Sequence, residues 1–204
     1  LLSAHQAIVA AGAEKPDLAG MGSTAVVVQI AGRRCRYAWC GDSRAYLWRR
    51  NKLERLTRDH SVVQGRVDAG EISNTDALGH AEQNILVQAL GIREPRPDEL
   101  ELELRSGDWL VLCSDGLHDT LSDREIAQIL SAGGAPSARA HALVERALEM
   151  DAKDNISVIV IQCPEYPGDP LASPGRTGLW WLVAVGAAVA AALLLRVMWR
   201  STGQ

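Results

Sequence analysis

Acidic residues stand at the ends of short apolar runs in this chain, and the clearest case follows residues 109–113. The sequence there, Trp-Leu-Val-Leu-Cys, is short and continuously apolar, which predicts a buried strand. Asp115 follows one residue later, Gly116 interrupts the pattern, and Asp119 adds a second acid. A carboxylate held by rigid backbone at a strand end is suited to bind a hard cation. The alternative is that Asp115-Gly116 is an ordinary turn and Asp119 a helix-start residue.

Two further acids occupy similar positions. Asp42 follows an apolar-rich segment at 35–40, and Asp154 precedes a second one at 156–161. If two antiparallel sheets bring these strand ends together, three carboxylates share one small space, where like charges raise each other's pKa. A divalent cation removes that cost, and ligation by oxygen alone favours Mg²⁺ or Mn²⁺ over Zn²⁺.

Such a site predicts hydrolysis of a phosphate ester. Two ions a few ångströms apart would lower the pKa of a bridging water and orient it for attack at phosphorus. A cysteine mechanism needs the spacing C-x₅-R, and none of the four cysteines has an arginine six residues later. A serine nucleophile at Ser114 needs the pattern G-x-S-x-G, and position 112 is Leu112 instead of glycine.

Composition limits the remaining classes. The chain has 204 residues, enough for one ordinary domain, and its net charge of −4 argues against nucleic-acid binding, which needs a basic surface. The four cysteines contain no C-x-x-C pair, so we expect reduced, buried thiols. No signal peptide is visible, although the chain begins at Leu1 instead of a methionine.

The periodicity predicts an α+β domain that positions these acids. In its first half we expect an antiparallel meander, and in its second half a half-exposed strand followed by two buried ones. Helices are expected at the N-terminus, before Gly70, after the capping box Ser122-x-x-Glu125, and after Pro136. The predicted strands are residues 23–30, 35–40, 45–48, 53–56, 100–104, 109–113 and 156–161, and the first two predicted helices are residues 1–15 and 62–69.

The C-terminal part has a different character. Residues 164–178 are rich in proline and glycine and predict a stiff linker. Residues 179–195 carry no charge, and tryptophans lie near both ends of the segment 179–199, which predicts a transmembrane helix. A tail of residues 200–204 follows. The alternative is a helix buried in a protein core.

Six motifs in order resemble the type 2C (PPM) metal-dependent Ser/Thr protein phosphatases in their compact bacterial form. The resemblance covers residues 1 to about 162. The motifs are Gly20-Met21-Gly22-Ser23-Thr24, Gly41-Asp42-Ser43-Arg44, Leu56-Thr57-x-Asp59-His60-Ser61, Asn84-x-Leu86-x-x-Ala89-Leu90-Gly91, Ser114-Asp115-Gly116-Leu117-x-Asp119 and Asp154-Asn155-Ile156-Ser157-Val158.

The resemblance implies a four-layer α-β-β-α sandwich, two antiparallel sheets flanked by helices. It implies that Asp115 and Asp154 bind one of two core Mn²⁺ or Mg²⁺ ions, and that Asp42 with Asp115 holds a third, weaker ion. Asp119 would lie just outside the ligands of that third ion, and Asn155 would brace the Asp154 loop. The implied reaction is hydrolysis of phosphoserine or phosphothreonine in proteins by a metal-bound bridging hydroxide.

For other motif residues, the resemblance implies roles other than metal binding. Residues 61–84 correspond to the family's mobile flap, which affects substrate access. We expect Arg44 and the segment Asp59-His60-Ser61 to organise the fold around the site instead of contacting phosphate.

The chain also departs from the family pattern. The opening strands, with the phosphate-binding arginine and the metal-bridging aspartate of Asp-Gly-x-Gly-Gly, have no counterpart and are expected upstream of Leu1. We therefore expect residues 1–163 to be a partial phosphatase domain with no catalytic residue of its own, inactive and poorly folded when alone. Asp151-Ala152 replaces a glycine-containing turn, a change we expect to be tolerated.

The resemblance implies that the partners are phosphorylated Ser/Thr proteins, the targets of a cognate kinase. The C-terminal apolar segment adds the membrane as a partner, and the net charge argues against nucleic acid. Arg176 precedes the uncharged residues 179–195 and Arg196 and Arg200 follow them, which favours a cytosolic C-terminus. Free thiols and phosphoprotein substrates nevertheless favour a catalytic domain in the cytoplasm. The alternative functions are a catalytically dead pseudophosphatase and a membrane-tethered binding or sensor module.

Overall fold

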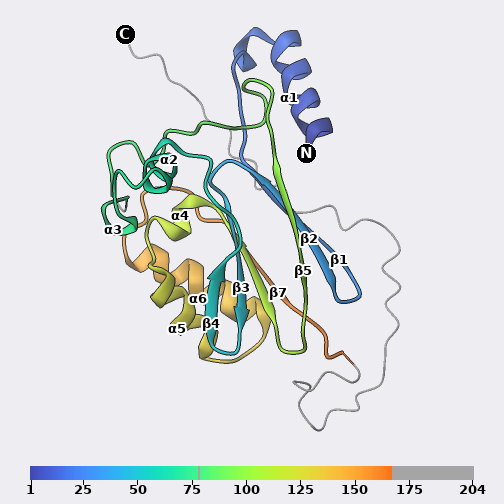
Figure 1. Ribbon diagram of the computed structural model, residues 1–204, viewed down its shortest axis with the longest axis vertical. Coiled ribbons are helices and arrows are strands. Elements are labelled where there is room, and N and C mark those ends of the chain that lie inside the picture. The colour runs from blue at the N-terminus through green and yellow to red at the C-terminus, as the bar shows by residue number, and fades with distance from the viewer. Residues whose placement is uncertain (78, 167–204) are drawn as a thin grey trace.

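The computed structural model describes residues 1–77 and 79–166, which form two antiparallel β-sheets with helices packed around them (Figure 1). One sheet has the strand order β1-β2-β5 and the other has the order β4-β3-β6-β7. The strands are β1 (Ala25–Ala31), β2 (Arg34–Cys40), β3 (Arg44–Arg49), β4 (Lys52–Arg55), β5 (Asp98–Glu103), β6 (Trp109–Cys113) and β7 (Val158–Gln162).

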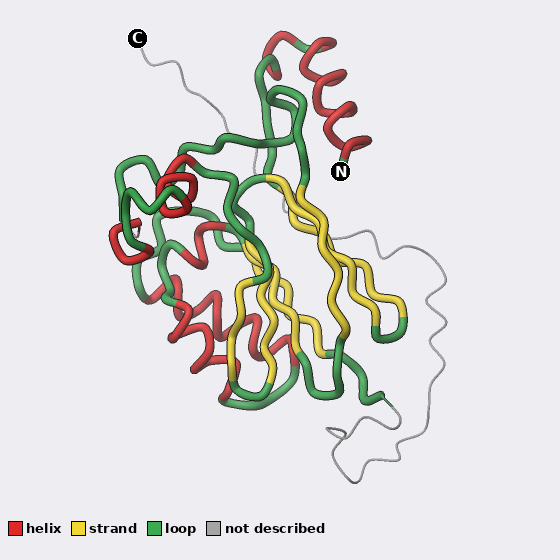
Figure 2. Tube along the Cα trace, viewed as in Figure 1, coloured by secondary structure: helices red, strands yellow, loops and turns green. Residues whose placement is uncertain are grey.

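Helices cover the outer face of the four-stranded sheet, as Figure 2 shows in red beside the yellow strands. Two of them, α5 and α6, supply most of that layer, and α4 packs at its end. The helices are α1 (Leu2–Glu14), α2 (Val62–Asp68), α3 (Asn74–Ala77), α4 (Asp115–His118), α5 (Asp123–Ser131) and α6 (Pro136–Glu149), with a 3₁₀ turn η1 (Pro16–Leu18). The predicted α+β class is confirmed.

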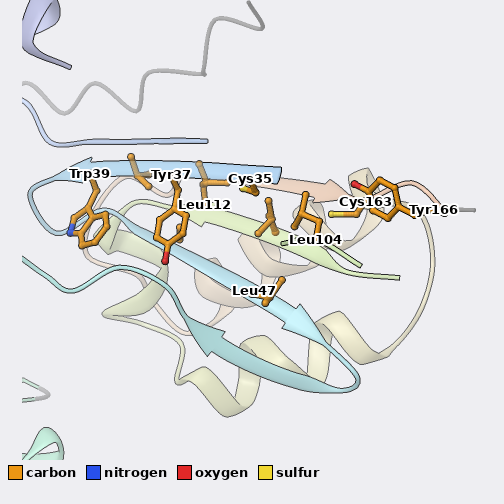
Figure 3. Packing of buried hydrophobic residues seen from close by; sticks show 11 residues of the cluster. Cys35, Tyr37, Trp39, Leu47, Leu104, Leu112, Cys163 and Tyr166 are labelled. Atoms are coloured by element: carbon orange, nitrogen blue, oxygen red, sulfur yellow. The ribbon is translucent and has the colours of Figure 1, made fainter. Parts of the chain in front are cut away.

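The space between the sheets is filled by one hydrophobic cluster, shown from close by in Figure 3. Tyr37 and Trp39 of β2 are buried there on one side, and Leu47 of β3 with Leu110 and Leu112 of β6 is buried on the side of the other sheet. Alternate residues of β6 instead face the helices. Both faces of this strand are therefore buried, which explains why its sequence is continuously apolar.

Helix α1 lies beyond one end of the three-stranded sheet (Figure 1). Leu1, Ala4 and Ile8 pack against Ala25 and Cys40, which lie at one end of the three-stranded sheet. The rest of α1 contributes no buried residue. Among residues 1–77 and 79–166, two sheets and the helices outside the four-stranded sheet are seen, and the predicted fourth layer stays a prediction.

The predicted meander was wrong at one connection. β1 pairs with β2 and β3 pairs with β4, but β2 and β3 belong to different sheets. Gly41 makes this crossover possible because glycine readily adopts its φ of 109°, which other residues rarely do. A Cβ at this position would also lie only 2.4 Å from Thr24 Cγ2. The chain therefore turns from one sheet to the other at the residue before Asp42.

Several local predictions are confirmed. The capping box of α5 is present, since Ser122 Oγ accepts from Glu125 N and Glu125 Oε2 accepts from Ser122 N. Ser61 caps α2 by accepting from Gln64 N, and Pro136 opens α6. All four cysteines are free and buried.

The C-terminal predictions fall largely outside the described residues. Tyr166, three residues into the predicted linker, still packs in the cluster between the sheets and donates from its hydroxyl to Gly32 O at 2.9 Å. The predicted transmembrane helix at 179–199 and the tail at 200–204 lie beyond the described part. Among residues 1–77 and 79–166, no helix is long and apolar enough to cross a membrane.

Candidate metal centre

The three aspartates singled out in the sequence lie at the same end of the four-stranded sheet. In the register of this sheet, Arg44 of β3 pairs with Cys113 of β6, and Cys113 pairs with Val158 of β7. Asp42 precedes that end of β3, Asp115 follows that end of β6, and Asp154 precedes that end of β7. Because β3, β6 and β7 are consecutive in the sheet, the three loops are neighbours.

Asp42 and Asp115 form a buried pair of carboxylates. Their residues are 7% and 4% exposed. The pKa of Asp42 is raised to about 6, first by burial and then by the charge of Asp115, against a smaller opposing effect of His118. Two buried like charges are costly when both are ionised, and a divalent cation between or beside them offsets that cost. Their oxygen donors fit Mn²⁺ or Mg²⁺.

Asp115 is the first residue of a one-turn helix. The sequence predicted a turn or strand end here, whereas the structure continues into α4, with Ser114 as the N-cap residue. Asp115 Oδ1 accepts from Gly116 N at 2.9 Å, and Asp119 N donates to Asp115 O at 2.8 Å. A carboxylate in the first turn of a helix also suits the positive end of its dipole.

The loop of Asp154 is attached to the start of α4 by Ser114. Ser114 Oγ donates to Asn155 O at 3.0 Å and accepts from Ser157 N at 3.0 Å, and Ser114 N donates to Ser157 O. Asp154 Oδ1 accepts from Asn155 N at 2.7 Å. Asn155 thus takes part through its main chain, while the residue itself is exposed, and its bracing role stays a prediction.

Gly116 allows this close approach. A Cβ at Gly116 would lie 2.5 Å from Asn155 O and 3.1 Å from Asp154 O, both of them backbone atoms. Any other residue would push the Asp154 loop away from α4. Sequence reasoning treated Gly116 as a strand breaker and missed this role, and it considered Ser114 only as a nucleophile.

His118 connects two of the predicted site residues. Its Nε2 lies 3.0 Å from Asp42 O, and its Nδ1 lies 3.2 Å from Asp119 Oδ1. The His118 side chain is 3% exposed, while that of Asp119 is 33% exposed. Sequence reasoning gave His118 no role. The available signal was its spacing of three residues from Asp115, which places both side chains on one side of a helical turn.

Arg44 and Asp59 form a largely buried ion pair beside the carboxylates. Arg44 donates to Asp59 from Nε at 3.0 Å and from Nη2 at 2.6 Å. Burial raises the pKa of Asp59, but the hydrogen bond and charge of Arg44 outweigh it and leave the pKa below its usual value. The neighbouring His60 accepts from Gly41 N through Nδ1 at 3.2 Å. Through these contacts Arg44, Asp59 and His60 hold neighbouring segments together, which is the role expected from the resemblance.

A pocket of about 490 Å³ is lined by Asp42, but not by Asp115 or Asp154. Asp42, His118 and Asp119 line one side, and residues of α2 with Gln83 and Asn84 line the other. A larger pocket of about 850 Å³ lies between residues 17–21 and 84–93 and contains none of the three aspartates. Chemistry at the sheet end therefore belongs with the smaller pocket.

The structure brings only some of the predicted metal ligands close together. Asp42 and Asp115 are close enough to influence each other, and Asp154 lies on the loop attached to α4. Within residues 1–77 and 79–166, no group of three or more His, Cys, Asp or Glu side chains is placed to hold a metal ion. The described residues thus supply a carboxylate pair and an adjacent third acid.

Two antiparallel sheets with helices packed around them, and acids at the ends of β3, β6 and β7, agree with the arrangement that the resemblance implies. The family model described as Protein phosphatase 2C matches residues 5–156. The chain belongs to the protein phosphatase 2C family.

Bacterial relatives are similar over most of this chain. The Ser/Thr protein phosphatase PstP of Mycobacterium tuberculosis is 38% identical over 162 residues, which are 79% of this chain and 31% of PstP. The Ser/Thr phosphatase stp of Listeria monocytogenes is 37% identical over 147 residues, 72% of this chain and 58% of the relative. The chain therefore spans less than two thirds of the length of either protein.

Solved structures agree with this assignment. The crystal structure of M. tuberculosis PstP matches with a TM-score of 0.75 at 38% identity, covering 79% of this chain and 68% of that one. The catalytic domain of PstP in complex with two manganese ions matches with a TM-score of 0.70 at 38% identity, covering 76% of this chain and 65% of that one.

Proposed function

We propose that this protein hydrolyses phosphoserine and phosphothreonine in proteins, using Mn²⁺ or Mg²⁺. The observation that carries the proposal is the buried pair Asp42 and Asp115 at the end of the central strands. Membership of the protein phosphatase 2C family and the two manganese ions bound by PstP support the choice of reaction and metal.

The acids have distinct roles in this proposal. Asp115 and Asp154 hold one core ion, and Asp42 with Asp115 holds a weaker one beside it, with Asp119 just outside. When bound, the ions lower the pKa of the attacking water and neutralise charge on the phosphate. The protein itself positions these acids. Ser114 fixes the Asp154 loop to α4, and Gly116 allows that loop and α4 to approach each other closely.

The pocket of about 490 Å³ receives the substrate in this proposal. Asp42 and Asp119 line it together with flap residues, among them Gln64, Gln83 and Asn84. Their amide groups can hydrogen-bond to a peptide backbone without requiring a charge of either sign. The flap thereby lies where the peptide next to the phosphorylated residue would bind.

For the intact enzyme, the test is hydrolysis of a phosphothreonine peptide in Mn²⁺. Asp115→Asn and Asp154→Asn should each lower kcat by about a hundredfold or more, because each removes a ligand of an ion that contributes several kcal/mol to the reaction. Asp42→Ala should lower kcat less. Asp151→Asn, the same change on an exposed acid three residues before Asp154, should leave kcat unchanged. Equal and small losses at all three proposed ligands would contradict the metal roles.

A second candidate is a catalytically inactive relative that binds phosphoproteins or acts as a sensor. It is favoured by the absence, within residues 1–77 and 79–166, of a group of three acidic or imidazole side chains placed to hold a metal. Binding of a phosphothreonine peptide without turnover, in wild type and in Asp115→Asn alike, would support this candidate.

The organisation and location of the protein are further parts of the proposal. Residues 1–163 form the phosphatase domain, 164–178 a linker, and 179–199 a transmembrane helix that keeps the domain at the cytoplasmic face. Its substrates are the targets of a cognate Ser/Thr kinase. Accessibility of the domain to protease in intact spheroplasts tests the orientation, since a cytoplasmic domain is protected until the membrane is opened.

A further inference from the structure

His118 bridges two loops that the proposed metal site needs in fixed relation. It ends the one-turn helix α4, three residues after Asp115, and its side chain is 3% exposed. Its two ring nitrogens face different partners. Nε2 lies 3.0 Å from the carbonyl oxygen of Asp42, which is 76 residues away in the chain, and Nδ1 lies 3.2 Å from Asp119 Oδ1.

The partner of Nε2 determines its role. A backbone carbonyl can only accept a hydrogen bond, so Nε2 is the protonated ring nitrogen and donates a hydrogen bond to the carbonyl oxygen of Asp42. This bond acts on the main chain of Asp42, so it orients the residue and leaves its carboxylate available. Nδ1 lies near the carboxylate of Asp119 but makes no hydrogen bond to it, so the bond from Nε2 to the main chain of Asp42 is the contact that carries the inference.

The loop that carries Asp42 is held on its other sides by different residues. Gly41 N donates to His60 Nδ1, His60 N donates to Gly41 O, and Thr24 Oγ1 is hydrogen-bonded to Ser43 Oγ at 2.9 Å. These contacts fix the loop to the three-stranded sheet and to the segment before α2. The His118 bond fixes the loop to α4, the element on which Asp115 lies.

We infer that His118 is the positioning residue that keeps Asp42 opposite Asp115, and thereby sets the affinity of this carboxylate pair for a divalent cation. The inference rests on the proposed function, because it assumes that the pair binds a metal. A residue that orients a ligand through a hydrogen bond typically changes metal affinity by about 10- to 100-fold when it is removed.

The test is binding of Mn²⁺ to the full chain, measured by the electron paramagnetic resonance signal of the free ion, with the thermal unfolding midpoint recorded for each variant. His118→Leu should weaken Mn²⁺ binding at the weakest site by about tenfold or more. His118→Gln, whose amide nitrogen can reach the position of Nε2 and donate, should retain most of the affinity. His141→Leu, which removes an exposed histidine of α6, is the control for adventitious binding by imidazole and should change nothing.

Different outcomes overturn different claims. Unchanged affinity in a folded His118→Leu variant would overturn the positioning role alone. Equal losses in His118→Leu and His118→Gln would also overturn it, because the imidazole would then matter for something other than its Nε2 donor. Absence of Mn²⁺ binding by the wild type would overturn the proposed function and, with it, this inference.

Discussion

Replacing Gly116 by alanine probes the contact that brings Asp115 and Asp154 together. The added Cβ would lie 2.5 Å from Asn155 O, whereas ordinary van der Waals contact begins at 3.4 Å. The Asp154 loop or α4 must therefore move by about 0.9 Å, because the obstructing atoms belong to the backbone and cannot rotate away.

The size of that shift sets the expected effect. A displacement of about 1 Å between groups that act on one substrate can lower a rate by about a hundredfold. Overpacking of this kind also costs about 1–3 kcal/mol of stability. We expect Gly116→Ala to weaken Mn²⁺ binding and to lower kcat by about a hundredfold, while the protein remains folded at 20 °C.

Gly65→Ala is the matched control. Gly65 lies within the helix α2, and a Cβ there meets no atom within 4 Å. Alanine is more favourable than glycine in a helix by about 0.5–1 kcal/mol, so this variant should be slightly more stable and bind Mn²⁺ normally. Titration with Mn²⁺ and steady-state kinetics are measured for both. Wild-type affinity and turnover in Gly116→Ala would refute the idea that this contact controls the site.

Two further predictions concern charges and thiols. Asp59 has a lowered pKa when folded, so the stability from its pair with Arg44 is present above about pH 4 and is lost as pH falls through that lower pKa. Asp59→Asn should lower the free energy of unfolding at pH 7 by about 3 kcal/mol, because it leaves the mostly buried guanidinium of Arg44 without its counter-charge. It should also flatten the pH dependence of urea unfolding below pH 4. An equal loss of stability at pH 7 and at pH 2 would contradict this. Burial raises the pKa of Cys35 to about 11 and that of Cys113 to about 12, and all four cysteines are buried, so no thiol should react with a disulfide reagent at pH 8 until guanidinium chloride unfolds the protein. Rapid reaction of one thiol in the native protein would show that its surroundings open.

The strands were predictable because burial leaves a direct mark on their sequences. β6 is buried on both faces and is apolar throughout, so its five residues were identified to the residue. Which strands share a sheet was harder. The segment between β2 and β3 is short and looks like a hairpin turn, but Gly41 redirects the chain into the second sheet, and side-chain periodicity carries no information about that choice.

The site was predictable in its acids but not in the residues that hold them. Asp42, Asp115 and Asp154 were visible because each stands at the end of an apolar run. The role of Gly116 depends on how closely the main chain of Asn155, 39 residues away, approaches, and that of His118 depends on a carbonyl 76 residues away. Both are consequences of the fold, since neither contact can be inferred from neighbouring residues in the sequence.

The metal site itself is tested most directly by a crystal structure of the protein grown with Mn²⁺, with diffraction data collected at the manganese absorption edge. The account predicts anomalous difference peaks within ligand distance of Asp115, one shared with Asp154 and a weaker one shared with Asp42. Fully ordered loops at this end of the sheet with no anomalous peak beside Asp115, in the presence of millimolar Mn²⁺, would contradict it.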